Sequence, residues 1–484
     1  MLSNTALESD QGFTDMEIQK DGRMVVIGNQ LDRSKIMVAR YHSDGQTLDF
    51  SFGRDGIQML DIYDSIWADA DEIATGLAID PKTSKMYVCG YIHIKRPSAD
   101  TLRMSEAKGF ISRLNADGTL DNAFGDSGTV EVSLGKDWGG FLDDEWTTVN
   151  QCILEPDGKP IVVGHTVKDD GGAGFIQRYD LNGKLDGGFK NNNTLFTVDM
   201  TPDVPEKSET SYIDVSINKK GNIFVLGSYD DVRSGDARVS QGFVAGFDTF
   251  GNPIHFKESG KNFVPLYNEK PTDDPIRVVG AARSLYKHHI SKNYRYLPNP
   301  IGHIALQETG DIGDPKTART YILVSSHTHF DAKEMAIVKR MDVDGKTLTN
   351  HFFNFDSNFR SNPWDFNQFG PDAEIDNVRT QNAPSPLFVD ANQKVYLAFG
   401  GREKMGSRLL KPHLIRLNSD LSLDTSFGET PLGGDGGTLT PDLPYGFPLK
   451  IWATPSGNIA VAGFTTETPD GGGLRLGYMA QARE

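Results

Sequence analysis

A short phrase recurs along the chain and is clearest at residues 110–125, where it reads FISRLNADGTLDNAFG. Complete or degraded copies begin near Met37, Phe175, Phe243, Ala336 and His413. Each copy follows an apolar run that ends in glycine or serine. Self-similarity at a spacing of tens of residues means that one supersecondary unit is stacked many times. The repeat therefore predicts an architecture, and it leaves the function open.

Each repeat divides into short strands separated by turns. One strand ends in the Pro-Asp-Gly sequence at 156–158, and a second strand follows directly. Glycine suits such a hairpin because it tolerates the positive φ that a tight turn needs. Second strands of this kind recur at 24–28, 86–90, 161–164, 223–227, 321–325, 395–400 and 459–463. A variable loop then leads to a third strand and to the Asp-Gly turn of the phrase.

Four short strands in each of seven units predict an all-β fold, a seven-bladed β-propeller of four-stranded antiparallel blades. We expect residues 1–484 to form this single domain. A β-solenoid is the competing fold, but its coils are usually shorter than the ~65 residues of each unit here. The last unit is incomplete, because the chain ends at Glu484 without an Asp-Gly turn. An unpaired strand edge invites aggregation, so we expect residues 1–8 to complete the last blade.

Charge and hydropathy exclude several classes of protein. The net charge of −17 and the pI near 5.1 argue against a nucleic-acid partner, because phosphate backbones bind clustered Lys and Arg. No window approaches the ~20 apolar residues of a membrane span. Residues 1–10 lack the basic and apolar regions of a signal peptide. We expect a monomer that is cytoplasmic, exported by a leaderless route, or trimmed. Cys89 and Cys152 lie in apolar strands and predict buried thiols rather than a disulfide or metal pair.

The phrase resembles the repeat of the Delta-60 proteins of bacteria, whose units carry Ala-Arg-Leu-Asn-x-Asp-Gly-Ser-Leu-Asp-x-x-Phe-Gly. Good copies contain Arg40, Arg113, Arg178 and Arg416, and poorer copies fall at Gly246 and Arg340. The resemblance covers almost the whole chain. It implies a propeller, often in surface or exported proteins, and it implies no shared activity or catalytic residue.

The phrase also predicts a structural clasp. Arg40, Arg113, Arg178 and Arg416 are followed eight or nine residues later by Asp49, Asp121, Asp186 and Asp424. A turn separates the two positions, so guanidinium and carboxylate can meet as a bidentate pair across a hairpin. In the fourth unit both partners are lost together, to Gly246 and Ile254. Phenylalanines three residues after the aspartate position are expected to fill the space between blades, namely Phe52, Phe124, Phe189, Phe352 and Phe427.

Function is expected where the units differ, because common residues build the scaffold and variable loops carry sites. In a propeller, the loops that lead into first strands and those that leave second strands emerge on the same face. Here these loops carry Asp, His and Trp, which we expect to converge at one mouth of the channel. The candidate ligand-binding residues are Trp67, Asp71, Asp144, Trp146, His165, His327 and His329.

These residue types suit three kinds of site. His327 and His329 lie on one side of an extended segment, and imidazole with carboxylate suits Zn²⁺ or Mn²⁺. Asp71 and Asp144 are the candidate ligands for Ca²⁺, which is the one cofactor the sequence suggests, although no loop has complete calcium-loop spacing. Trp67 and Trp146 suit capture of a sugar or peptide. Solvated loop residues and packed tryptophans are the competing interpretations.

The leading hypothesis is a non-enzymatic binding or interaction protein that holds a protein, peptide or carbohydrate ligand on one face. The alternative is a hydrolase or lyase with a metal-assisted site at the channel mouth. The sequence contains no Gly-x-Ser-x-Gly elbow, phosphate-binding glycine loop or His-Glu-x-x-His motif. Residues 257–300 form a basic, tyrosine-rich insertion between the fourth and fifth units. We expect it to dock a partner, to cover the mouth, or to form an ordered surface excursion.

Deletion of residues 1–8 should lower the melting temperature by several degrees if this segment completes the last blade. The lost strand would leave an edge without hydrogen-bond partners. Differential scanning calorimetry of the full-length and truncated proteins measures the change, and an unchanged melting temperature would contradict this closure.

Overall fold

The computed structural model describes a series of segments that together hold most of the repeats. They are residues 13–30, 34–63, 69–95, 106–134, 146–168, 171–192, 195–196, 210–231, 239–266, 302–310, 317–330, 333–354, 386–402, 410–428, 438–439, 446–453, 459–466 and 475–482. All regular structure in these segments is β-strand. A search of the same residues finds no helix that could span a membrane.

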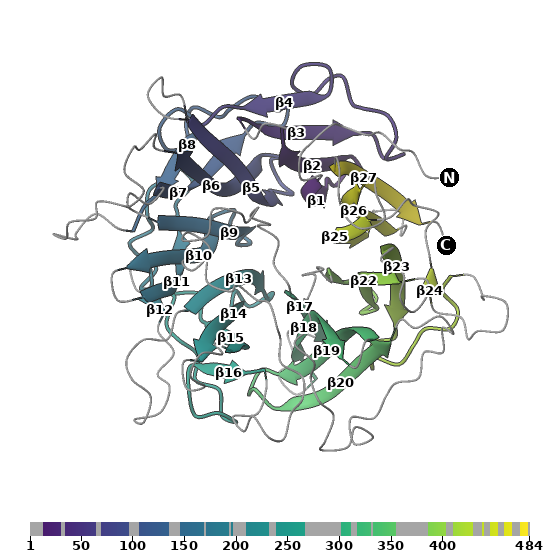
Figure 1. The fold of residues 1–484 in the computed structure, drawn as a ribbon. Coiled ribbons are helices and arrows are strands. Elements are labelled where there is room, and N and C mark those ends of the chain that lie inside the picture. Colours follow the sequence, from purple (N-terminus) through teal and green to yellow (C-terminus); the bar gives the residue numbers. More distant parts are fainter. Residues whose placement is uncertain are drawn as a thin grey trace.

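Antiparallel sheets form a ring (Figure 1). The first sheet contains β1 (Phe13–Ile18), β2 (Met24–Asn29), β3 (Ile36–Tyr41) and β4 (Ile57–Leu60). An eight-stranded sheet contains β5 (Asp69–Ile79), β6 (Met86–Lys95), β7 (Glu106–Leu114), β8 (Thr129–Val132), β9 (Trp146–Leu154), β10 (Pro160–Lys168), β11 (Gly171–Arg178) and β12 (Leu195–Phe196). Its two halves, β5–β8 and β9–β12, are joined by one parallel bridge between Ala107 and Trp146.

The remaining sheets continue the ring toward the C-terminus. One contains β13 (Thr210–Ile217), β14 (Ile223–Asp231), β15 (Val239–Phe247) and β16 (Phe263–Pro265). The next contains β17 (Gly302–Thr309), β18 (Arg319–Phe330), β19 (Lys333–Asp342) and β20 (Thr347–Asn354). Then come β21 (Leu387–Val389), β22 (Val395–Arg402), β23 (Leu410–Leu417) and β24 (Thr438–Leu439). The last sheet contains β25 (Gly446–Ala453), β26 (Ile459–Thr466) and β27 (Arg475–Ala482).

The expectation of an all-β, propeller-like fold built from four-stranded antiparallel sheets is confirmed. Within the described residues no sheet closes on itself, and the last sheet has three strands. Figure 1 places β1 beside β25–β27, and Phe13 and Met16 pack there against Ala460 and Ala462. Residues 1–8, which the sequence assigns to the missing strand, lie outside the described residues. Most of the insertion at 257–300 also lies outside them, although β16 falls within its range.

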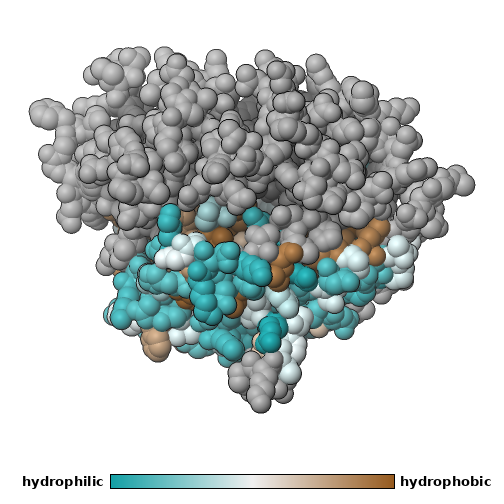
Figure 2. Space-filling model, turned by 90° about the horizontal axis from the view of Figure 1, so that it is seen from below, coloured by the Kyte–Doolittle hydropathy of each residue, from teal (hydrophilic) through white to brown (hydrophobic). Residues whose placement is uncertain are grey.

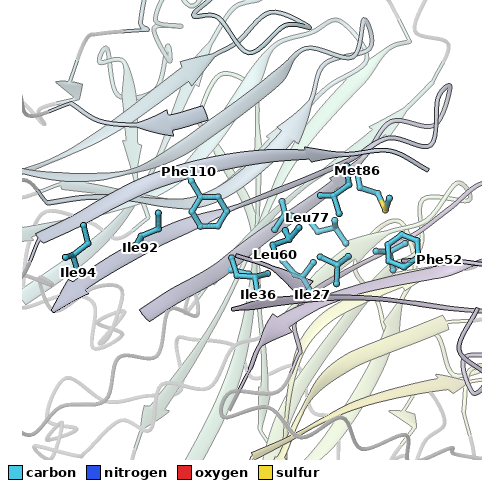
Figure 3. Packing of buried hydrophobic residues seen from close by; sticks show 14 residues of the cluster. Ile27, Ile36, Phe52, Leu60, Leu77, Met86, Ile92, Ile94 and Phe110 are labelled. Atoms are coloured by element: carbon cyan, nitrogen blue, oxygen red, sulfur yellow. The ribbon is translucent and has the colours of Figure 1, made fainter. Parts of the chain in front are cut away.

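Apolar side chains fill the space between neighbouring sheets. Between the first sheet and β5–β8, Ile27 and Leu60 face Leu77 and Phe110 in one cluster (Figure 3). Strands such as β2 are buried along their whole length, because sheets cover both of their faces. The described residues on the face seen in Figure 2 are mostly hydrophilic, with apolar residues between them.

The recurring turn of the repeat fastens one sheet to the next. Arg113 Nε donates to Asp121 Oδ2 at 2.8 Å, and the Arg113 guanidinium lies 4.8 Å from the ring centre of Phe124. The Arg113 Nη1 group donates to the carbonyl of Leu181, in the turn of the following unit. Gly125 N donates to the carbonyl of Asn182 in that same turn at 2.9 Å. The arginine therefore links its own hairpin to its neighbour.

The other good copies repeat this geometry. The Nε–Oδ2 distances are 2.8 Å for Arg40–Asp49, 3.0 Å for Arg178–Asp186 and 2.8 Å for Arg416–Asp424. Each pair forms through Nε alone, whereas the sequence suggests a bidentate pair. The reason is that Nη1 reaches the next unit instead, at the carbonyl of Ala116 for Arg40 and of Thr249 for Arg178.

The two poorer copies differ from each other. Gly246 leaves room for Phe256 and Ile254, since a Cβ at this glycine would lie 3.2 Å from the Phe256 ring and 3.3 Å from the Ile254 side chain. Arg340 Nη1 still donates to the carbonyl of Ser419 in the next unit at 2.8 Å. Phe52, Phe124, Phe189 and Phe427 are all buried. The side chain of Phe352 lies outside the described residues.

Arg113→Ala should lower the free energy of unfolding by ~1–3 kcal/mol, because Asp121 and the Leu181 carbonyl each lose a donor in a buried site. Chemical denaturation monitored by tryptophan fluorescence measures the change. Arg54→Ala removes an exposed arginine from the first unit and serves as the control. Equal stability of the two variants would mean that the guanidinium contributes little.

Candidate functional site

A backbone irregularity recurs on the innermost strands of the ring. The register of β1, β5, β9, β13 and β25 shifts by one residue within each strand. A β-bulge of this kind turns the following side chain in a new direction. The residues that directly follow the shifts are Asp15, Gly76, Gln151, Asp214 and Lys450. The side chains of Asp15, Gln151, Asp214 and Lys450, together with His303 on β17, meet at the centre of the ring.

Contacts between strands of different repeats show this convergence. Lys450 Nζ on β25 lies 3.1 Å from Asp15 Oδ1 on β1. Gln151 Nε2 on β9 donates to Asp15 Oδ2 at 3.3 Å, although β5 lies between these strands in the ring. Gly76 on β5 makes the approach possible, because a Cβ there would lie 2.0 Å from Gln151 Oε1. We call Asp15, Gln151, Asp214, His303 and Lys450 the axial cluster.

The two aspartates of the axial cluster also join adjacent sheets. Asp15 accepts hydrogen bonds from the backbone N–H groups of Met16 at 2.7 Å and Leu77 at 3.0 Å. Asp214 accepts from Val215 at 2.8 Å and from Ile304 at 3.0 Å. Each carboxylate therefore binds its own strand and the first strand of the next sheet. Such contacts fix the position of both side chains.

His303 extends the cluster to a further sheet. His303 Nδ1 lies 3.3 Å from Asp214 Oδ2, and its side chain is 8% exposed. No described residue supplies a hydrogen-bond partner for His303 Nε2. Burial raises the pKa of Asp214, but His303 and Lys450 outweigh that effect and hold the pKa below its ordinary value. Asp214 thus remains an acceptor that can orient the imidazole.

Glu17 lies two residues beyond Asp15 on β1. Its Oε2 accepts a hydrogen bond from the backbone N–H of Ile79 at 2.7 Å. Burial raises the pKa of Glu17 to about 8; Lys450 lowers it in part and Asp15 raises it further. Burial opposes the charge of Lys450, but Asp15, Asp214 and Glu17 together raise its pKa. At neutral pH the centre of the ring therefore holds a protonated carboxyl beside an ammonium group.

Solvent reaches part of this arrangement. The Lys450 side chain is 19% exposed, and Glu17 is partly exposed as well. A protonated carboxyl with a pKa near the working pH can act as a general acid, and an imidazole held by a carboxylate can take up a proton. The axial cluster and Glu17 therefore provide proton-transfer groups at a position that several sheets define.

A second group lies where β5 and β9 begin. Asp71 and His93 are opposite each other on β5 and β6, and His93 Nδ1 lies 3.8 Å from Asp71 Oδ2. The His93 ring is 5.6 Å from the Trp146 ring, with a tilt of 60°. Trp146 is 5% exposed, so it packs in the interior rather than presenting a flat face. The structure thus brings Asp71 and Trp146 together with His93.

The other residues singled out in the sequence are distributed differently. His165 is buried on β10, in register with Thr148 on β9 and Gly174 on β11. His327 and His329 lie on β18, opposite Ala336 and Glu334, and their side chains are outside the described residues. Trp67 and Asp144 lie outside the described residues as well. The convergence of all seven residues at one mouth therefore stays a prediction.

Metal binding also stays a prediction. Among the described residues, no group of three His, Cys, Asp or Glu side chains is placed to hold a metal ion. Asp71 is the only one of the two candidate Ca²⁺ ligands that the structure describes. Cys89 and Cys152 are buried free thiols. They fill space in one interior cluster with Phe124 and Phe175.

The sequence analysis missed the axial cluster, although a signal was present. When the first strands are aligned on their apolar residues, Asp15, Gly76, Gln151, Asp214 and Lys450 fall in one column. Each is followed by an apolar residue that faces the interior, such as Met16 or Val215. A charged or small residue in such a column is unusual for a buried strand. These five positions hold four different residue types. The strands therefore do not look alike at this column, and the column was not recognised as a common feature.

Three segments, residues 106–124, 155–189 and 410–427, match a family described as "Domain of unknown function (DUF5122) beta-propeller". These segments include Arg113, Arg178 and Arg416 with their partner aspartates. The match supports a β-propeller repeat family for the recurring phrase, without naming the Delta-60 repeat. A search of curated proteins gave no significant match.

Solved structures with a similar fold include the polysaccharide lyase Uly1, with 11% identity and a TM-score of 0.46, over 99% of this chain and 91% of that chain. An α-L-arabinanase from Penicillium chrysogenum has 9% identity and a TM-score of 0.41, over 87% and 100% of the two chains. The intramolecular trans-sialidase from Ruminococcus gnavus has 9% identity and a TM-score of 0.37, over 99% and 95%. At such identities the likeness concerns the fold alone.

These structures are of enzymes, and they contradict the leading sequence hypothesis of a non-enzymatic binding protein. The alternative of a hydrolase or lyase agrees better with them. The error has a physical reason. The lack of a short catalytic motif counted against catalysis, whereas a ring of sheets collects its reactive groups from strands far apart in the chain. The axial cluster spans residues 15 to 450 in this way.

Glu17→Gln should remove a pH dependence of stability. The folded-state pKa of about 8 exceeds the ordinary value of 4.5, so folding favours the protonated form and stability falls as the pH rises from about 4.5 to about 8. The glutamine variant should lose less stability over this range. Urea denaturation at a series of pH values measures it, with Glu131→Gln, an exposed glutamate, as the control. If the free energy of unfolding changed with pH in the same way in wild type and Glu17→Gln, the raised pKa of Glu17 would be contradicted.

Proposed function

We propose that this chain is an enzyme that cleaves a glycan, as a hydrolase or a lyase, with its reactive groups at the centre of the ring. One observation carries the proposal: Glu17, with a pKa of about 8, lies beside the Lys450–Asp15 ion pair and is partly exposed. Cleavage of a glycosidic bond needs a proton for the departing oxygen, and a carboxyl kept protonated near neutral pH supplies it.

The other groups of the axial cluster have supporting roles in this proposal. Lys450 keeps a positive charge next to Glu17 and stabilises the carboxylate that Glu17 becomes once it has given up its proton. His303, oriented by Asp214, is the candidate acceptor of a proton. Substrate would reach these groups from the end of the ring where β5 and β9 begin. Asp71 and His93 lie at that end, and Asp71 with Asp144 would hold Ca²⁺ there if a metal takes part.

The proposal includes two finer statements about the scaffold. We regard the ring as seven blades, with β5–β8 and β9–β12 counted separately because a single bridge joins them. We also assign the repeats to the Delta-60 type, on the sequence of the turn and on the recurring contacts of its arginine. Both statements concern how the site is held, and the chemistry does not depend on them.

The activity can be tested with purified protein and a panel of polysaccharides, from neutral arabinan and galactan to polygalacturonate and alginate. Release of reducing ends reports hydrolysis or elimination, and ultraviolet absorbance reports the unsaturated uronate that only a lyase forms. Glu17→Gln should reduce the rate by ~10²–10⁴-fold, as expected for a general acid. Glu131→Gln should retain the wild-type rate, because Glu131 is exposed on β8 at the outside of a sheet.

Assays with added Ca²⁺ and with a chelator complete the test. A rate that depends on Ca²⁺ and is lost in Asp71→Asn would support the metal at the strand ends. Equal rates of wild type and Glu17→Gln would exclude Glu17 as the acid. No cleavage of any polymer in the panel, with or without Ca²⁺, would count against the proposed function itself.

A further inference from the structure

The charges at the centre of the ring limit which glycans can bind there. Asp15 and Asp214 contribute carboxylates, and Glu17 contributes a third acidic group. Of the described residues that meet there, Lys450 is the one that carries an ammonium. That ammonium is already paired with Asp15 at 3.1 Å and interacts with Asp214 and Glu17. Little positive charge is therefore left for a bound anion.

The net charge of the whole chain also disfavours the binding of an anionic glycan. A net charge of −17 repels polyanions at long range and slows their approach to the site. Inside the ring, low dielectric strengthens the repulsion between a substrate carboxylate and Asp15 or Asp214. Hydroxyl groups meet no such penalty, because they can accept a hydrogen bond from Lys450 and donate one to a carboxylate.

His303 gives the site a polar group that is ready for a ligand. Its side chain is more than nine-tenths buried, Nδ1 faces Asp214, and Nε2 has no hydrogen-bond partner among the described residues. A buried polar atom in this condition usually has a partner, which can be a ligand or an ordered water. A neutral imidazole Nε2 accepts a hydrogen bond from a hydroxyl group or from water.

Elimination and hydrolysis make opposite demands on such a site. Elimination removes a proton next to a uronate carboxylate, so negative charge builds up on that carboxylate and requires cations around it. In hydrolysis the attacking water loses a proton and its oxygen bonds to the anomeric carbon. The glycosidic bond breaks, and the departing oxygen receives a proton. His303 Nε2 can take the first proton and Glu17 can supply the second, with no anionic group in the substrate.

From these observations we infer that the substrate is an uncharged glycan and that it is cleaved by hydrolysis. The inference rests on the proposed function and narrows it to one substrate class. Asp15 and Asp214 exclude uronates from the centre of the ring. Lys450 balances these carboxylates and does not serve as an anion receptor.

Matched polymers that differ only in charge test the inference. Polygalacturonate and alginate are each compared with their carboxyl-reduced forms, which keep the linkages and lack the charge. We expect reducing ends from a neutral polymer, no unsaturated product from any polymer, and at least about tenfold weaker binding of the anionic form at low salt. Neutral arabinan and galactan extend the set. Binding is measured by calorimetry with the Glu17→Gln protein, so that the polymers stay intact.

The outcomes separate the inference from the function on which it rests. Formation of unsaturated uronate, or tighter binding of the anionic form, would overturn the inference while the protein remained a glycan-cleaving enzyme. Absence of binding and cleavage for every polymer would overturn the proposed function and the inference with it. Binding of the charged and the uncharged polymers is also compared in Lys450→Gln. Selective loss of uronate binding in that variant would identify Lys450 as an anion receptor and refute the inference.

Discussion

In most of the described repeats, an arginine of the recurring turn holds neighbouring sheets in place. Arg113 illustrates the arrangement, with its Nε on Asp121, its plane against Phe124 and its Nη1 on the carbonyl of Leu181 in the next unit. The guanidinium suits this task because it offers several donors in a fixed plane and remains charged. Backbone hydrogen bonds such as that from Gly125 N to the carbonyl of Asn182 join the same turns, so the position of each sheet relative to the next depends on these contacts together. The geometry at the centre of the ring depends in turn on how the sheets are placed.

Much of this scaffold was visible in the sequence. The recurring Asp-Gly turn and the apolar runs before it predict short antiparallel strands, because glycine at the turn and β-branched residues in the strands each favour one backbone conformation. The pairing of arginine with aspartate could be inferred from their joint loss at Gly246 and Ile254. The hydrogen bond from Arg113 to the carbonyl of Leu181 could not be inferred from the sequence, because it joins residues that are far apart in the chain and depends on how two sheets pack.

The site was harder to predict than the scaffold. Asp71 and Trp146 attracted attention because charged and aromatic residues in variable loops are a familiar sign of binding, and the structure does bring them together with His93. Asp15 and Lys450 were overlooked because they lie within short strands, more than four hundred residues apart in the chain. Only the bulges on β1 and β25 turn them toward each other. A bulge leaves almost no trace in a single sequence, since it adds one residue without changing the apolar pattern around it.

These bulges separate the packing between sheets from the presentation of side chains at the centre of the ring. The residues on either side of each bulge pack between sheets, whereas the residue at the bulge faces its counterparts from the other sheets. Gly76, Gln151 and Lys450 differ in size, polarity and charge, yet they occupy the same place on strands of the same geometry. The chemistry presented at the centre can therefore be altered one strand at a time while the interior contacts stay the same. In a ring of repeats, the side chains at the centre can therefore be exchanged without a change in the turns that hold the sheets together.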